Sequence, residues 1–200
     1  MKAATRYPGR IRIIGGHWRG RFIDVPDAPG LRPTGSRIRE TLFNWLMPVV
    51  AGARCLDLFA GAGALGFEAA SRGAAQVTLL DRDADAIGHL RATAARLGAD
   101  EVECIQADAV AWLDRAAGPF DIVFLDPPFQ SDLLEPCLER LNRRQLLNRG
   151  ALIYMEADKR LDMSQLPSAW RIRREKTSGQ VRYLLLEAAS APVPEHNNNA

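Results

Sequence analysis

The feature that most constrains the fold of this chain is a glycine-rich turn between an apolar run and a helical pattern. Residues 54–69 read RCLDLFAGAGALGFEA, in which the apolar run is followed by Gly61, Gly63 and Gly66. Glycines let the backbone turn sharply and let a ligand approach where a Cβ would collide. The stretch therefore predicts a strand over 54–59, a tight turn, and a helix to about residue 72.

The charge beside this turn indicates which ligand it accepts. The glycine spacing satisfies G-x-G-x-x-G, which is typical of dinucleotide sites. Asp57, however, stands four positions before Gly61, and its carboxylate would repel a pyrophosphate. It suits a ligand with positive charge, such as the ammonium and sulfonium of S-adenosylmethionine. We therefore predict an S-adenosylmethionine loop, with Gly61 and Gly63 at the ligand and Asp57 acting on its cationic end through backbone or water.

The rest of the chain repeats the strand–helix unit. Further strands are predicted at 76–80, 102–106, 120–125 and 151–156, helices at 84–97, 110–116 and 132–141, and a terminal antiparallel pair at 170–176 and 181–187. Successive β-α units give a right-handed, doubly wound sheet. We expect an α/β fold with a mostly parallel seven-stranded sheet whose last strand is antiparallel. The expected parts are a basic hairpin extension (1–33), the main domain (34–187) and a disordered tail (188–200).

The N-terminal part is basic although the whole chain is nearly neutral. Residues 1–44 carry nine Lys/Arg against three Asp/Glu, whereas the net charge of the chain is +2. Two alternating segments, 10–14 and 21–25, predict a hairpin whose polar face holds Arg10, Arg12, Arg19 and Arg21. Such a face could follow the phosphates of a nucleic acid, and the alternative is a solvated surface. Trp18 at the tip either stacks on a base or packs against its own hairpin.

A helix with two basic residues near its start follows the hairpin. Thr34 is expected to cap it, and Ile38, Leu42, Trp45 and Leu46 give it an apolar face. The cations in its first turns are Arg37 and Arg39. We expect them to meet a phosphate of the substrate or a carboxylate of the cofactor.

Four carboxylates stand at the ends of predicted strands, where an open α/β sheet binds its ligands: Asp57, Asp81, Asp108 and Asp126. Asp81 lies twenty residues after Gly61, at the spacing of an acid that binds ribose hydroxyls. Asp108 is expected to accept from an adenine amine, with Phe59 or Ala109 lining the ring. Each carboxylate alone could be a turn former, but together they predict a cofactor site.

The sequence Asp126-Pro127-Pro128-Phe129 follows an almost wholly apolar strand. Two prolines fix the backbone, so the loop is rigid. The Asp126 carboxylate and the Pro127 carbonyl together suit an –NH2 group with two hydrogens to donate. They would orient its lone pair toward the methyl group, and Phe129 would stack on the base. We therefore assign Asp126, Pro127 and Phe129 to catalysis.

Composition and spacing argue against other sites and compartments. The three cysteines, Cys55, Cys104 and Cys137, are scattered and show no metal-binding or redox spacing, so we expect no metal and a reduced, cytoplasmic protein. The N-terminus lacks the apolar region of a signal peptide, and no run approaches membrane-spanning length. A monomer is expected.

These motifs resemble those of class I, Rossmann-like methyltransferases that act on amino groups. The segments at 12–20 (RIIGGHWRG), 32–34 (RPT) and 37–44 (RIRETLFN) resemble more narrowly the signature of the bacterial RsmD family. This resemblance implies transfer of a methyl group from S-adenosylmethionine to N2 of one guanine in 16S ribosomal RNA of the small subunit. The chain departs from the family pattern at Gly35-Ser36, where a Thr-Asp pair is expected.

Other functions stay open from the residues alone. An adenine-N6 or protein-glutamine methyltransferase would also use an Asp/Asn-Pro-Pro-aromatic loop, although the basic hairpin argues against a protein substrate. The glycine pattern by itself allows a nicotinamide oxidoreductase, against which Asp57 argues. A non-catalytic RNA-binding module would not need the intact glycines, Asp81 and Asp126.

Overall fold

The structure is a computed structural model, which describes residues 9–25, 35–128 and 131–188. Its centre is a seven-stranded sheet in the order β5-β4-β3-β6-β7-β9-β8. The strands are β3 (Arg54–Asp57), β4 (Gln76–Asp81), β5 (Val102–Gln106), β6 (Phe120–Leu125), β7 (Leu147–Asp158), β8 (Trp170–Ser178) and β9 (Val181–Ala188). Strands β3 to β7 pair in parallel, and β9 is antiparallel to both β7 and β8. The predicted fold class is confirmed.

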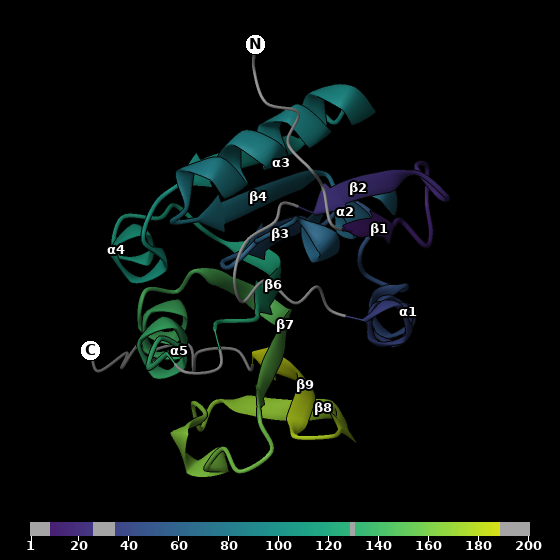
Figure 1. Cartoon of the computed structure of the whole chain (residues 1–200). Coiled ribbons are helices and arrows are strands. Elements are labelled where there is room, and N and C mark those ends of the chain that lie inside the picture. The colour runs from purple at the N-terminus through teal and green to yellow at the C-terminus, as the bar shows by residue number, and fades with distance from the viewer. Residues whose placement is uncertain (1–8, 26–34, 129–130, 189–200) are drawn as a thin grey trace, which may run out of the picture.

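The helices divide between the two faces of the sheet. Helices α1 (Ser36–Leu46), α2 (Ala64–Ser71) and α3 (Ala84–Leu97) pack with one apolar cluster, and α4 (Ala109–Leu113) and α5 (Leu134–Arg143) pack with the other. Figure 1 shows α4 and α5 on one side of the sheet and α1 on the other. We call the side that carries α1 the α1 face.

Most predicted elements lie where the pattern placed them, and β7 shows the clearest difference. The strand was expected to begin at 151, after a polar segment, but it begins at Leu147. Leu147 already pairs with Phe120, and the register then shifts before Ile122. The side chain of Asn148 donates to Asp121 at 2.6 Å, so side chains as well as backbone hold this early part of the strand.

The hairpin consists of β1 (Gly9–Arg12) and β2 (Phe22–Val25), which form a separate antiparallel sheet. Its apolar residues lie in the same core cluster as α1, α2 and α3: Ile11, Ile13, Trp18, Ile23 and Val25. Hydrophobic burial therefore fixes the hairpin to the main sheet's α1 face.

Helix α1 begins one residue later than a Thr34 cap would place it. Its N-cap residue is Gly35, which offers no side-chain hydrogen bond, and Thr34 lies outside the described residues. Leu42, Phe43 and Leu46 are buried, and Ile38 and Trp45 pack against the same core. The predicted apolar face is confirmed.

Candidate active site

The glycine turn connects β3 to α2 in the tight conformation that its sequence predicted. Gly61 and Gly63 have positive φ angles of 52° and 80°. A Cβ on Gly63 would lie 2.6 Å from Phe67 and 2.7 Å from Leu90, so glycine is required there for space as well as conformation. The N–H of Ala60 also donates to the Leu80 carbonyl at 2.9 Å, which ties the loop to the end of β4.

Asp81 ends β4 directly beside this loop. Its Oδ2 accepts the Gly61 N–H at 2.9 Å, and its Oδ1 accepts the Asp83 N–H at 2.9 Å. Asp83 in turn caps α3 by accepting the N–H groups of Asp85 and Ala86. The half-buried Asp81 carboxylate is therefore fixed at the edge of the sheet where a ribose would lie.

Asp57 lies beneath the loop, with only 2% of its surface exposed. Burial raises its pKa from 3.8 to about 7, and hydrogen bonds from the backbone N–H groups of Phe59 and Gly66 oppose that rise. The nearby Asp81 carboxylate raises the pKa further. Asp57 thus supports the backbone that would face a ligand. This position agrees with an action through backbone rather than by direct contact.

The third carboxylate, Asp108, caps α4. It is exposed, and its Oδ1 accepts the Ala111 N–H at 2.9 Å. Ala109 is buried at the first position of the helix, and Phe59 is half-buried against the core of that face. The sheet order places the ends of β5, β4 and β3 side by side, so these predicted cofactor residues share one edge.

The Asp126-Pro127-Pro128 loop leaves β6, the next strand beyond β3. Asp126 is half-buried, Pro127 is buried and Pro128 is exposed. The Pro128 carbonyl accepts the N–H of Ser131 at 2.9 Å and its hydroxyl at 2.7 Å, which closes the loop toward α5. A cavity of about 300 Å³ adjoins Pro127 and Pro128. Phe129, the predicted stacking residue, lies outside the described residues.

Sequence reasoning missed a fifth carboxylate at the end of a strand. Glu156 lies near the end of β7, is 7% exposed and lines the cavity beside Pro127. Its Oε1 accepts the hydroxyl of the fully buried Tyr154 at 2.8 Å. The signal was available, because the strand-end rule that selected the four aspartates also selects this glutamate.

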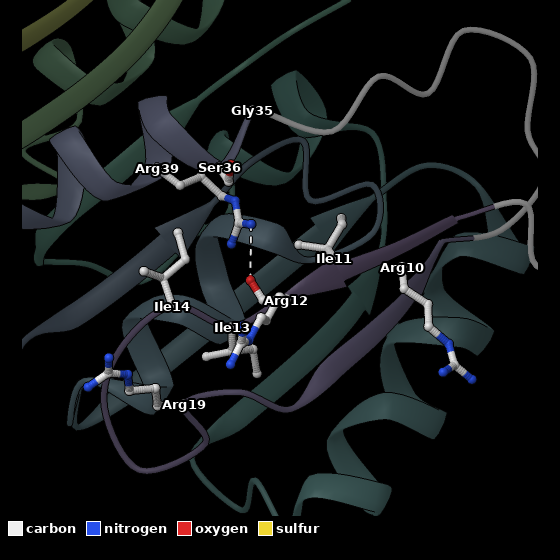
Figure 2. A pocket seen from close by; sticks show the side chains of 9 residues that line it. All are labelled: Arg10, Ile11, Arg12, Ile13, Ile14, Arg19, Gly35, Ser36 and Arg39. Carbon is white, nitrogen blue, oxygen red and sulfur yellow. Dashed lines mark hydrogen bonds between the residues drawn. The ribbon is translucent and has the colours of Figure 1, made fainter.

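A second cavity, of about 510 Å³, lies between the hairpin and the start of α1. Figure 2 shows the side chains of Arg12, Arg19 and Arg39 around it, whereas Arg10 points away from that group. Arg12 and Arg19 are exposed, and Arg10 pairs with Asp24 at 3.3 Å. Arg21 on the hairpin and Arg37 on α1 are exposed as well. The hairpin thus presents several solvent-facing cations, as its sequence predicted.

The structure corrects the prediction for Arg39. The residue is 3% exposed, and its guanidinium lies 3.5 Å from the carboxylate of Glu68 and donates to the Arg12 carbonyl at 3.1 Å. Helical spacing turned this side chain toward the core instead of toward the surface where Arg37 lies. Arg39 therefore joins α1, α2 and the hairpin, and is not available to a phosphate.

The alternatives for Trp18 are also decided by burial. Trp18 is 4% exposed and packs in the core of the α1 face. Its backbone N–H donates to the Ser71 hydroxyl oxygen at 2.9 Å. The alternative in which Trp18 packs inside the protein is therefore correct. From this buried position Trp18 cannot stack on a base.

Glu68 on α2 is the centre of a buried clamp that the sequence analysis did not identify. Its side chain is fully buried and accepts the N–H groups of Ile14 and Gly15, each at 2.8 Å. Arg72 donates to it at 2.8 Å, and Arg39 completes the group. The signal for this role was that Glu68 is the single acidic residue of α2, a helix whose eight residues are all buried.

The described part of the chain comprises residues 9–25, 35–128 and 131–188. Within them no cluster of three or more His, Cys, Asp or Glu side chains could hold a metal ion. No helix in this part of the chain combines the length and the apolar character needed to cross a membrane.

Comparison with known proteins agrees with this geometry. Residues 11–187 match the family model described as "Conserved hypothetical protein 95". The chain is 48% identical over 179 residues to the Ribosomal RNA small subunit methyltransferase D of Escherichia coli strain K12, covering 90% of each chain, and 43% identical to that of Haemophilus influenzae, covering 90% of this chain and 94% of the relative.

Solved structures show the same relation. The putative methyltransferase yhhF from Escherichia coli superposes with a TM-score of 0.84 at 45% identity, over 92% of this chain and all of the other. The putative methylase HI0767 from Haemophilus influenzae gives a TM-score of 0.80 at 39% identity, over 91% of this chain and all of the other. The family match along nearly the whole chain, with relatives above 40% identity, shows that this chain belongs to the ribosomal RNA small subunit methyltransferase D (RsmD) family.

Proposed function

We propose that this protein transfers a methyl group from S-adenosylmethionine to the exocyclic N2 of one guanine in 16S ribosomal RNA of the small subunit. The observation that carries the proposal is the rigid Asp126-Pro127-Pro128 loop one strand away from the glycine turn. The names of the relatives support ribosomal RNA of the small subunit as the substrate class.

The residues present fit the proposed cofactor. The edge formed by β5, β4 and β3 offers carboxylates and a glycine loop without an intervening Cβ. Asp81 would accept the ribose hydroxyls, Asp108 the adenine amine, and Phe59 and Ala109 would line the ring. Gly61 and Gly63 would let the backbone approach the methionine end. Once bound, S-adenosylmethionine supplies an electrophilic methyl group on a positively charged sulfur.

The loop after β6 would prepare the amine for reaction. An exocyclic amine is a poor nucleophile, because its lone pair is delocalised into the ring. The Asp126 carboxylate and the Pro127 carbonyl would accept its two hydrogens, favour a pyramidal nitrogen and direct the lone pair to the methyl group. Methyl transfer would place positive charge on the amine nitrogen. Asp126 would stabilise that charge and accept the proton that leaves.

The basic hairpin would bind the RNA around the target base. Exposed cations such as Arg12 and Arg19 on the hairpin and Arg37 at the start of α1 would contact phosphates. Removing a base from its stack costs a few kcal/mol, and stacking on Phe129 would return roughly 1–3 kcal/mol. Cation–phosphate contacts would supply the rest of the binding free energy.

The remaining parts of the proposal follow from this role. Residues 1–33 would form the RNA-binding extension and 34–187 the methyltransferase domain. The protein would act as a monomer in the cytoplasm, where small subunits assemble, and would need no metal.

The substrate class is tested by transfer of labelled methyl from S-adenosylmethionine to unmodified small subunits, free 16S rRNA and cell protein in parallel. Label in the small subunit or in its rRNA is the expected result, with Asp126→Ala as an inactive control. Label in protein alone would overturn the proposal.

A further inference from the structure

Three neighbouring strands carry one row of polar side chains next to the substrate loop. The last pair of the parallel β6–β7 ladder is Leu125↔Met155, so Asp126 and Glu156 are the residues that follow on the two strands. On the other side of β7, Glu156 is paired with Tyr183 of β9. Adjacent strands lie about 4.8 Å apart. Asp126 therefore has Glu156 as its neighbour across the ladder.

Side chains alternate along a strand, so Asp126 lies on the same side as Phe124, and Glu156 on the same side as Tyr154, which is the α1 face of the sheet. Burial raises the pKa of Tyr154, and the Glu156 and Asp126 carboxylates raise it further. The pKa of Tyr183 is raised by burial and by the same two carboxylates. Both hydroxyls therefore stay protonated. Tyr154 uses its hydroxyl to hold Glu156.

Glu156 is thus a buried acid in a fixed position beside the reacting loop. Burying a carboxylate is unfavourable unless hydrogen bonds or charges compensate it, so such a residue at a strand end is more than a surface group. Two carboxylates on adjacent strands can accept hydrogen bonds from two neighbouring donor groups of one ligand.

Guanine presents such a pair of donors. Its N1–H and its N2 amine stand side by side on the Watson–Crick edge, whereas adenine has an unprotonated N1 that accepts. On the basis of the proposed function, we propose that Glu156 accepts the N1–H of the target guanine while Asp126 and Pro127 hold the N2 amine, and that Glu156 thereby selects guanine. A carboxylate has about four acceptor positions, so the bond from Tyr154 is compatible with one from the base. Tyr154 is the positioning residue.

The wild-type protein itself gives a first test. Small subunits would be assembled with guanine or with 2,6-diaminopurine at the methylated position; diaminopurine keeps the N2 amine but has an acceptor at N1. Loss of one such specific contact corresponds to about 10- to 100-fold discrimination, so kcat/KM should fall by that factor on diaminopurine. Equal kcat/KM on the two bases would overturn the role of Glu156.

Glu156→Gln should reverse part of this preference. The glutamine side chain still accepts N1–H through its oxygen, and its –NH2 can donate to N1 of diaminopurine. The ratio of kcat/KM for guanine to that for diaminopurine should therefore fall about 10-fold or more. A purely structural role would lower both values together and leave the ratio unchanged, which would overturn the proposal. Tyr154→Phe should lower the ratio less, and Glu139→Gln, on the exposed face of α5, should leave it at the wild-type value.

The outcomes also separate this inference from the proposed function. Methylation of N2 on both bases at equal rates would refute the selection by Glu156 and keep the function. Absence of any N2 methylation of small-subunit guanine by the wild-type protein would refute the function, and the inference with it.

Discussion

Glu68→Gln is expected to be among the most destabilising single changes in the chain, although it removes only one charge. The glutamate carboxylate is fully buried and accepts two backbone N–H groups of the hairpin and the guanidinium of Arg72. Arg39, whose pKa is lowered by burial and raised by Glu68, depends on the same carboxylate. A glutamine offers one oxygen and turns an –NH2 donor toward these donors.

The magnitude follows from breaking a buried ion pair on one side. Removing one partner typically costs about 3–5 kcal/mol, because the remaining charge stays buried without compensation. For a domain of this size each kcal/mol lowers Tm by about 2–4 °C, so a decrease of roughly 6–20 °C is expected. Since either Ile14 or Gly15 would lose its acceptor, the hairpin should also become sensitive to trypsin at its arginines.

Urea denaturation, thermal unfolding and limited proteolysis of Glu68→Gln would measure these effects. Glu40→Gln, at an exposed position of α1, is the matched control and should stay within about 0.5 kcal/mol of wild type. If Glu68→Gln unfolds at the same urea concentration as this control, the clamp does not hold the hairpin and the reasoning fails.

Four other changes test the site. Asp126→Ala should abolish turnover and leave cofactor affinity, measured by calorimetry, nearly unchanged; lost cofactor binding would refute Asp126 as a substrate ligand. Asp81→Ala should weaken cofactor binding about 10-fold or more, since it removes charged acceptors worth about 1.5–3 kcal/mol, and an unchanged Kd would remove it from the ribose role. Charge reversal of Arg12 and Arg19 should weaken RNA binding and reduce the slope of log K against log salt, whereas Arg149→Glu, exposed before the buried part of β7, should leave that slope alone. Asp57, whose folded pKa of about 7 exceeds its ordinary 3.8, stabilises the fold fully below about pH 4 and loses this contribution as pH rises to 7. The unfolding free energy of wild type minus that of Asp57→Asn should therefore fall by about 1.4 kcal/mol per pH unit over this range, and a constant difference would refute the raised pKa.

The sequence predicted the elements best where one physical signal dominates. Strand β6 and helix α3 were predicted at their observed bounds, because one is a continuous apolar run and the other begins at a capping aspartate and ends at a glycine with positive φ. The start of β7 was missed, because its pairing depends on a side-chain bond from Asn148 to Asp121 across 27 positions of sequence. Local pattern carries no information about such a contact.

The site was predictable to the extent that its residues stand at strand ends. That rule places Asp57, Asp81 and Asp108 at one edge of the sheet, and applied to β7 it would have included Glu156. Arg39 was expected to meet a phosphate or a cofactor carboxylate, and Trp18 was left open to stacking on a base, yet both are buried by the packing of the hairpin on α1 and α2. Residue type alone could not tell an arginine that faces RNA from one that neutralises a buried glutamate.

The measurement that tests the central claim most directly is the identity of the modified nucleoside. Small subunits lacking the modification would be incubated with the wild-type protein and S-adenosylmethionine, and their 16S rRNA digested to nucleosides for mass spectrometry. The account predicts one N2-methylguanosine per subunit, absent with Asp126→Ala. N6-methyladenosine would contradict it, since the row formed by Asp126 and Glu156 would then face a base without the N1–H that we assign to Glu156.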